Sequence, residues 1–489
     1  MSSSNSTLHV AILSSPGFGH IIPVLELGKR LIASNQNIRV TIFALSSTSQ
    51  AESLTIKEAT TAKLNVVTLP PVDISGLVDP KAAVVTCLAV IMREIRPAFR
   101  SALHDMACPP TMLIVDTFGT ESLLIGEELG IPKYVYIPSN AWFLALMTYS
   151  PTLDKEVEGE YVLRTEPLKI PGCRTVVPEE VIDPMLDRTN QQYSEYIRFS
   201  AEISLGDGIL LNIWEELQPT TLAAFRDEKL LGRVTKMVPV YPVGPLTRLV
   251  QSGDMTVNKD LFDWLDKQPS ESVIFVCLGS GGTLSNEQMM EMAWGLELSQ
   301  QRFIWVVRPP TTKSDAAFFT AGNGVGDVST YFPEGFLTRT SGMGFIVPLW
   351  APQVDILSHL SVGGFFSHCG WNSTLESVKN GVPMIAWPLY AEQRMNATLL
   401  TEELGVAVRS EVPPWKKVVG REEIERMVRK IMVENDGFKI RGRAKELKRS
   451  GERALREGGS SYNALSQVVS KTVQDMKIWR MNYHANENA

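Results

Sequence analysis

The chain has 489 residues, a formal net charge of −7 and a pI of about 5.6. A chain of this length is too long for one ordinary hydrophobic core, so two domains of similar size are expected. The acidic balance, with no basic stripe to neutralise several phosphates, disfavours a nucleic-acid-binding protein. The five cysteines are odd in number and lack CxxC spacing, which disfavours both a disulfide framework and a structural zinc site.

The N-terminal residues 1–7 are Ser-rich and uncharged, and the apolar run 8–13 is too short for a signal-peptide core and has no basic segment before it. No stretch of about 18 apolar residues occurs in the sequence. We therefore expect a cytoplasmic protein without membrane insertion.

Short β-rich runs alternate with segments of helical pattern, which predicts parallel sheets with helices on both faces. A first series of runs covers residues 8–15, 39–45, 64–70, 111–116 and 133–138, and a second covers 272–278, 302–307, 344–349, 363–367 and 384–388. The Pro-containing segment 238–269 between the two series is the expected linker. Two doubly wound halves are expected to bind ligands in a cleft at the carboxyl ends of their strands.

The loop after the first run, Ser14–His20, contains two glycines and ends in a histidine. A dinucleotide fingerprint fails there, because Ile22 replaces its third glycine and the second run ends without an acidic residue. His20 is instead a candidate for proton transfer at the mouth of the expected cleft.

Asp116 ends the fourth run and allows two interpretations. It could cap the next predicted helix, residues 121–129, or it could reach the His20 ring, fix its tautomer and stabilise the imidazolium. Ser139, after the fifth run, could likewise cap the helix that follows.

The segment Trp350–Gln393 gathers the most suggestive side chains. An apolar run ends there in a small-residue turn before a helical pattern, so a helix N-terminus with Asn372 or Ser373 as its cap could bind a phosphate. Ser373–Glu376 also matches a capping box, in which Glu376 would fold back on the helix start. Trp350 could stack on a flat base whose edge Gln353 could hydrogen-bond.

This 44-residue segment resembles the C-terminal signature of plant family 1 glycosyltransferases, which transfer sugar from a UDP-sugar to small lipophilic acceptors. The likeness includes the opening Trp350, the core His368–Ser373 and the closing Gln393. It implies the GT-B fold, with two Rossmann-like domains facing across a cleft. The expected organisation is an acceptor-binding domain 1–245 completed by a helix at about 462–480, a linker 246–260 and a UDP-sugar-binding domain 261–461.

The resemblance also implies roles for individual residues. The expected UDP-binding residues are Ser280, Trp350, Ala351, Gln353, His368, Trp371, Asn372, Ser373 and Glu376. The expected sugar-binding residues are Ser139, Trp371, Glu392 and Gln393. Glu392 departs from the family, which most often has Asp there; its side chain is one methylene longer and keeps the same hydrogen-bond acceptors.

His20 and Asp116 fall on the family's catalytic histidine and its supporting aspartate. The implied reaction has His20 remove the proton of an acceptor hydroxyl as that oxygen attacks C1 of glucose, inverting an α-linked donor to a β-glucoside. UDP-glucose is the expected donor. No Asp-x-Asp pair occurs in the sequence, so neither a metal ion nor another cofactor is expected.

The resemblance is strongest to the branch that glucosylates hydroquinone, monolignols and other phenols, so a flat phenolic or flavonoid acceptor is expected. The enzyme is expected to be a monomer. Aromatic and Met side chains suit such a ligand. The expected pocket residues are Phe18, Ile91, Trp142, Phe143, Met147, Met185, Tyr196 and Gly281. O-glucosylation is expected, and C-glucosylation on the same site is an alternative. An epimerase or a non-catalytic nucleotide-sugar binder is the alternative from another class.

Overall fold

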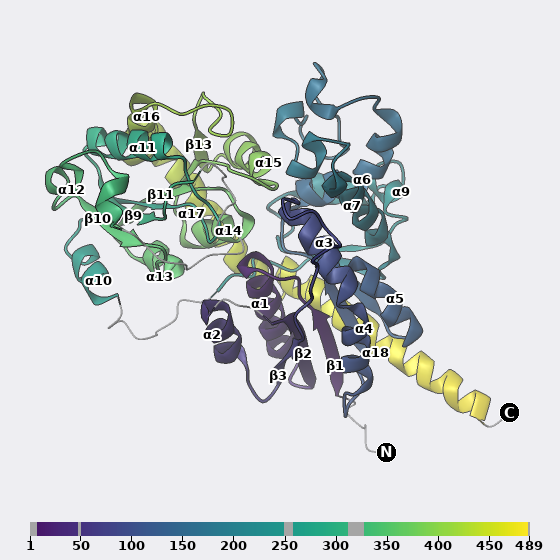
Figure 1. Cartoon of the computed structure of the whole chain (residues 1–489). Helices are drawn as coiled ribbons and strands as arrows, with labels where there is room; N and C mark the ends of the chain where they lie inside the picture. The colour runs from purple at the N-terminus through teal and green to yellow at the C-terminus, as the bar shows by residue number, and fades with distance from the viewer. Residues whose placement is uncertain (1–6, 47–49, 249–257, 312–326, 488–489) are drawn as a thin grey trace. The chain divides into compact units, whose positions relative to one another are not determined.

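The computed structural model describes residues 7–46, 50–248, 258–311 and 327–487. Two compact units divide the chain: Met1–Leu246 with Arg453–Ala489, and Thr247–Glu452 (Figure 1). Most of the expected linker 246–260 lies outside the described residues, because 249–257 are among those not described. Each unit is built on one parallel sheet.

The first unit contains a seven-stranded parallel sheet with the strand order β3-β2-β1-β4-β5-β6-β7. Its strands are β1 (Leu8–Leu13), β2 (Ile38–Leu45), β3 (Leu64–Leu69), β4 (Met112–Asp116), β5 (Lys133–Ile137), β6 (Gly208–Leu211) and β7 (Val240–Pro242). Its helices are α1 (Phe18–Ser34), α2 (Gln50–Ala59), α3 (Val84–Glu94), α4 (Arg96–His104), α5 (Leu123–Glu128), α6 (Ala141–Glu156), α7 (Gln191–Glu202), α8 (Pro219–Arg226) and α9 (Leu231–Val234).

The second unit contains a six-stranded parallel sheet with the order β10-β9-β8-β11-β12-β13. Its strands are β8 (Val273–Cys277), β9 (Arg302–Val307), β10 (Gly344–Pro348), β11 (Val362–Ser367), β12 (Met384–Ala386) and β13 (Ala407–Arg409). Its helices are α10 (Lys259–Leu265), α11 (Asn286–Ser299), α12 (Phe336–Arg339), α13 (Gln353–Ser358), α14 (Trp371–Asn380), α15 (Gln393–Thr398) with a π-helical turn (Leu399–Glu403), α16 (Arg421–Met432) and α17 (Asn435–Leu455).

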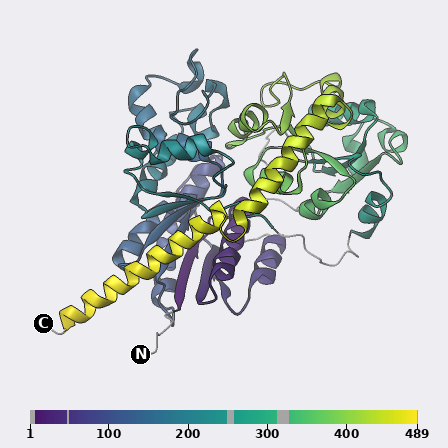
Figure 2. The ribbon, with the colours of Figure 1, turned by 180° about the vertical axis from the view of Figure 1, so that it is seen from behind.

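The last helix, α18 (Ser460–Glu487), drawn in yellow, returns to the first unit (Figure 2). It lies beside β7 and α1 there. Leu465, Val468 and Val469 join the hydrophobic core of that unit, and the Ser461 hydroxyl donates to the carbonyl of Gly244. The C-terminal part of the chain therefore stabilises the first unit by burying apolar side chains there.

The central strands are buried on both faces, which explains why they read as continuous apolar runs. Every residue of β1, β4, β8 and β11 is buried. The predicted fold class, two doubly wound parallel-sheet domains, is confirmed. No helix in the described part of the chain is long and apolar enough to cross a membrane.

Three strands were not predicted. β6, β7 and β13 are only three or four residues long, and each is held by parallel pairing with one or two neighbours rather than by a pattern of its own. β7 lies inside the segment 238–269 expected as a linker, and so does α10. The interpretation of that whole segment as a linker was therefore wrong.

Candidate active site

In the first unit, the strand order reverses between β1 and β4, which lie side by side in the sheet. Leu13 at the end of β1 pairs with Val115 on β4. The loops after these two strands consequently leave the same edge of the sheet at the point where α/β proteins bind ligands. The β1 loop leads to His20 and β4 ends in Asp116.

His20 lies in the first turn of α1, which begins after Gly17 in a left-handed conformation (φ 97°). Its Nδ1 atom is 2.7 Å from Oδ2 of Asp116. The His20 side chain keeps 18% of its surface exposed, whereas the Asp116 side chain is fully buried. Because the carboxylate accepts from Nδ1, the ring nitrogen turned away from Asp116 is Nε2, the atom available for proton transfer.

Asp116 also caps a helix, but not the expected helix 121–129, since the residue at the cap of α5 is Ser122. Its Oδ1 accepts from the N–H of Thr117 at 2.6 Å, where a short 3-10 helix begins, and its Oδ2 accepts from the N–H of Ser15 at 3.2 Å. Burial by itself raises the pKa of Asp116, but the charge of His20 and the bonds from His20, Thr117 and Ser15 together hold that pKa below its ordinary value. Asp116 is therefore an anion fixed beside the imidazole at neutral pH.

Phe118 is a neighbour of His20 that sequence reasoning missed. Its ring lies edge-on to the imidazole with centroids 5.3 Å apart, and it makes a second edge contact with Phe199 on α7. The signal available in the sequence was its position two residues after Asp116. The contact restricts the orientations open to the His20 ring.

In the second unit, the strand order reverses in the same way between β8 and β11, where Ser367 pairs with Cys277. The residues after both strands again meet at one edge. A Cβ atom on Gly279, after β8, or on Gly370, after β11, would lie 2.4 Å from Nε2 of His368. Both positions therefore require glycine for the imidazole to sit between the two loops.

Helix α14 begins earlier than expected, and the predicted cap was wrong. Gly370 occupies the cap position without any side-chain hydrogen bond, and Asn372 and Ser373 lie inside the first turn. The cause is the preceding turn: Cys369 adopts a left-handed conformation (φ 65°), and the amide of Asn396 donates to its carbonyl at 2.9 Å. The first backbone N–H groups of α14 still point out of its N-terminus, as a phosphate site needs.

His368 is uncharged at neutral pH. Its side chain is 7% exposed, and burial, with a further effect of the nearby Arg308 charge, lowers its pKa to about 4. Its Nδ1 atom is buried without a hydrogen-bond partner in the described part of the chain. A neutral imidazole in this position offers a phosphate a hydrogen bond rather than a charge.

The residues expected around the nucleotide come together near α14. Gln353 donates from Nε2 to Oγ of Ser373 at 2.9 Å and to Oε2 of Glu376 at 2.6 Å. Glu376 is almost fully buried, so the expected capping box is replaced by this contact with α13. Trp350 is 54% exposed, which leaves its indole accessible for stacking, and Ala351 beside it is buried.

Of the expected sugar-binding residues, Trp371 and Gln393 are buried, and the half-buried Glu392 occupies the N-cap position of α15. Oε1 of Gln393 accepts from the N–H of Leu389 at 2.9 Å. Ser139 lies in the first unit after β5, and the cap of α6 is Asn140, so the capping interpretation of Ser139 was wrong. Ser280, expected at the diphosphate, is exposed in the loop after β8.

The expected acceptor residues fall into two groups. Trp142, Met147, Met185 and Tyr196 are buried in the first unit, and Phe18, Ile91 and Phe143 are partly exposed there, whereas Gly281 lies in the second unit. The phenol of Tyr196 is bonded to Ser150 at 2.9 Å. In the described part of the chain, the buried indole N–H of Trp142 has no hydrogen-bond partner. Their role at an acceptor stays a prediction.

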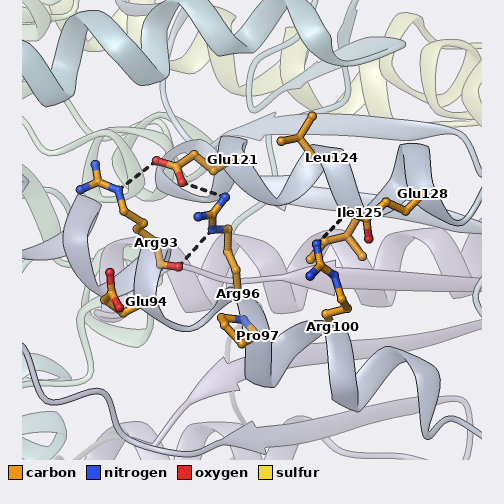
Figure 3. A pocket seen from close by; sticks show the side chains of 9 residues that line it. All are labelled: Arg93, Glu94, Arg96, Pro97, Arg100, Glu121, Leu124, Ile125 and Glu128. Atoms are coloured by element: carbon orange, nitrogen blue, oxygen red, sulfur yellow. Dashed lines mark hydrogen bonds and ion pairs between the residues drawn. The ribbon is translucent and has the colours of Figure 1, made fainter.

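A surface pocket of about 270 Å³ lies elsewhere in the first unit, beside α4 and α5 (Figure 3). Arg93 and Arg96 on its wall reach Glu121, and Arg100 reaches Glu128. None of the site residues named above lines this pocket. Its arginines are paired with glutamates, which is typical of a structural ion-pair network rather than of an anion site.

Within residues 7–46, 50–248, 258–311 and 327–487, no group of three or more His, Cys, Asp or Glu side chains is arranged to hold a metal ion.

Comparisons with known proteins agree with one another, and the similar proteins match nearly the whole chain. Residues 249–434 match the family described as UDP-glucoronosyl and UDP-glucosyl transferase. The chain is 63% identical over 479 residues to anthocyanidin 3-O-glucosyltransferase 5 of Manihot esculenta, covering 97% of this chain and 98% of that protein. It is 41% identical over 470 residues to hydroquinone glucosyltransferase of Rauvolfia serpentina, covering 95% and 98%. The solved structure of TcCGT1 in complex with UDP matches with a TM-score of 0.89 and 47% identity, covering 96% of this chain and 100% of that one.

Proposed function

Because the chain belongs to the plant family 1 UDP-glycosyltransferases, we propose that it transfers glucose from UDP-glucose to a hydroxyl group of a phenolic or flavonoid small molecule. The resemblance predicted from the segment Trp350–Gln393 is confirmed by the relatives that match nearly the whole chain. The observation that carries the proposal is the 2.7 Å hydrogen bond between His20 and Asp116 at the ligand-binding edge of the first sheet.

The proposed proton transfer uses this pair. Nε2 of His20 accepts the proton of the acceptor hydroxyl while that oxygen forms a bond to C1 of glucose. The bond between C1 and the diphosphate oxygen breaks on the opposite face, so the configuration at C1 inverts. Asp116 stabilises the imidazolium that forms, because its buried carboxylate lies against Nδ1.

The second unit binds the donor in this proposal. The N-terminus of α14, with the hydroxyl of Ser280 and the imidazole of His368, stabilises the negative charge that the leaving UDP acquires. Trp350 stacks on the uracil, and Gln353 forms a hydrogen bond with the edge of that base. Glu376, which is hydrogen-bonded to Gln353, accepts from the ribose hydroxyls. We assign the glucose hydroxyls to Trp371, Glu392, Gln393 and Ser139. No metal ion takes part in this mechanism.

The acceptor is a phenol rather than an aliphatic alcohol. The names of the relatives support this assignment, since one acts on anthocyanidins at a hydroxyl oxygen and another on hydroquinone. O-glucosylation is favoured over the C-glucosylation alternative on the same ground. The expectations of a cytoplasmic, monomeric enzyme stay predictions.

Product analysis tests the proposal. Purified protein is incubated with UDP-glucose and a panel of anthocyanidins, hydroquinone and other phenols, and the products are identified by mass spectrometry and by acid hydrolysis. The expected result is equal amounts of UDP and an acid-labile β-O-glucoside. An acid-stable glucoside would mean C-glucosylation, an isomerised UDP-sugar without glucoside would mean an epimerase, and no product over the whole panel would mean a binding protein.

A further inference from the structure

Arg308 is a partly buried cation that the reaction proposed above does not use. It follows β9 directly, on the strand next to β8 in the second sheet. Its Nη1 atom donates to the carbonyl of Gly279 and, at 3.4 Å, to that of Gly282. These two carbonyls belong to the loop after β8, which we call the glycine turn (Gly279–Gly282).

No carboxylate balances the charge of Arg308 within the described residues. The ionisable groups that face its guanidinium are the Cys277 thiol, the Tyr390 phenol and the His368 imidazole. Burial lowers the pKa of Arg308, although the guanidinium remains a cation at neutral pH. A positive charge that is partly removed from water and has no counter-ion is stabilised when a ligand supplies the negative charge.

The bonds from Arg308 also determine how the glycine turn presents its amides. The peptide bond is planar and trans, so an N–H points away from the carbonyl of the same peptide unit. Since the Gly279 carbonyl is directed at Arg308, the N–H of Ser280 points to the opposite side. Gly279 is left-handed (φ 78°) and touches His368, so this orientation is fixed from two sides.

We propose that Arg308 is a positioning residue for the donor diphosphate. It holds the glycine turn by two carbonyls, directs the Ser280 N–H away from itself toward the diphosphate, and places a positive charge behind that turn. The phosphates of the donor are the counter-ion that the described part of the chain does not provide. This inference rests on the proposed function, because it takes UDP-sugar as the ligand of the second unit.

The inference is tested by binding rather than by activity. Isothermal titration calorimetry measures the affinities of the wild-type chain, Arg308→Gln and Arg308→Lys for UDP and for uridine. Arg308→Gln removes both the positive charge and the charged donor that holds the glycine turn. The affinity for UDP should therefore fall roughly 10- to 100-fold. Uridine, which has no phosphate, should bind as to the wild type. Arg308→Lys should recover part of the UDP affinity, since it restores the positive charge but not the guanidinium hydrogen bonds to the two carbonyls of the glycine turn.

Arg441→Gln is the matched control. Arg441 also donates to two backbone carbonyls of the second unit, those of Gly363 and Ile431. Its loss should lower the melting temperature and leave the ratio of UDP to uridine affinity unchanged. If Arg308→Gln does not fold, Arg308→Lys carries the test, with UDP weakened several-fold and uridine unchanged.

Two results would overturn the inference while leaving the proposed function intact. One is unchanged UDP affinity in a folded Arg308 variant. The other is an equal loss of UDP and uridine, which would assign Arg308 a general structural role. A wild-type chain that binds no UDP would instead refute the proposed function, and the inference with it.

Discussion

Replacing Asp116 by Asn separates charge from shape at the proposed catalytic pair. The carboxylate uses both oxygens: Oδ1 accepts from Thr117, and Oδ2 accepts from His20 and Ser15. An amide of the same size has only one oxygen. With that oxygen on Thr117, the amide N–H₂ faces Nδ1 of His20 and leaves the ring proton on Nε2, which can then no longer accept a proton. In the other orientation, the amide faces the N–H of Thr117 and the charge beside the imidazolium is still lost.

The expected magnitude follows from the bond that is lost. A hydrogen bond to a charged group contributes about 1.5–3 kcal/mol, and this corresponds to a fall in kcat of roughly 10- to 150-fold. UDP affinity should change by less than about twofold, because the proposed nucleotide contacts belong to the second unit. The loss should be smallest for phenols that are already ionised at the assay pH, since these need no general base.

The assay measures initial rates at saturating UDP-glucose with a series of phenols that differ in the pKa of the hydroxyl group. Asp207→Asn is the control, because Asp207 is a carboxylate of the same unit that accepts from the backbone N–H of Lys133 at 2.9 Å. It should leave kcat unchanged. Wild-type kcat in Asp116→Asn with a phenol that is protonated at the assay pH would refute the reasoning.

Three further predictions concern the second unit and the donor. UDP-glucose should react faster than UDP-galactose or UDP-glucuronate, because a changed sugar substituent leaves buried polar groups unpaired. Faster turnover of either of these two donors in a competition assay would contradict the sugar contacts assigned to Trp371 and Gln393. Full activity is expected in excess EDTA, and a loss that Mg²⁺ or Mn²⁺ restores would refute the metal-free mechanism. The folded-state pKa of His368 lies at about 4, below its ordinary value. Between pH 6.5 and 4 the unfolded chain therefore binds a proton at this residue that the folded chain does not. The free energy of unfolding should fall by up to roughly 3 kcal/mol over this range. Thermal unfolding across this range should therefore depend less on pH in His368→Asn, and equal slopes would contradict the lowered pKa.

The strands that the sequence predicted well are those buried on both faces. β1, β4, β8 and β11 are continuous apolar runs with turn residues after them, so local composition was sufficient. β7 and β13 are three residues each and exist because a neighbouring strand supplies a ladder partner. Tertiary pairing of this kind has no local signal.

The same difference holds for the site. The contact between His20 and Asp116 could be predicted because Asp116 ends β4 and His20 follows the loop after β1, the neighbouring strand. The start of α14 could not, since the left-handed Cys369 and its bond from Asn396 determine where the helix begins. Arg308 was missed for a similar reason: its bonds reach a loop almost thirty residues earlier in the chain.

The most direct test of the central claim is the rate of glucoside formation by His20→Ala at saturating UDP-glucose, with UDP affinity measured on the same protein. Removal of a general base predicts a fall in turnover of roughly 10²- to 10⁴-fold, with UDP affinity nearly unchanged and the smallest loss for acceptors ionised at the assay pH. Intact turnover together with weakened UDP binding would show that His20 is a structural or nucleotide-binding residue and would contradict the proposed mechanism.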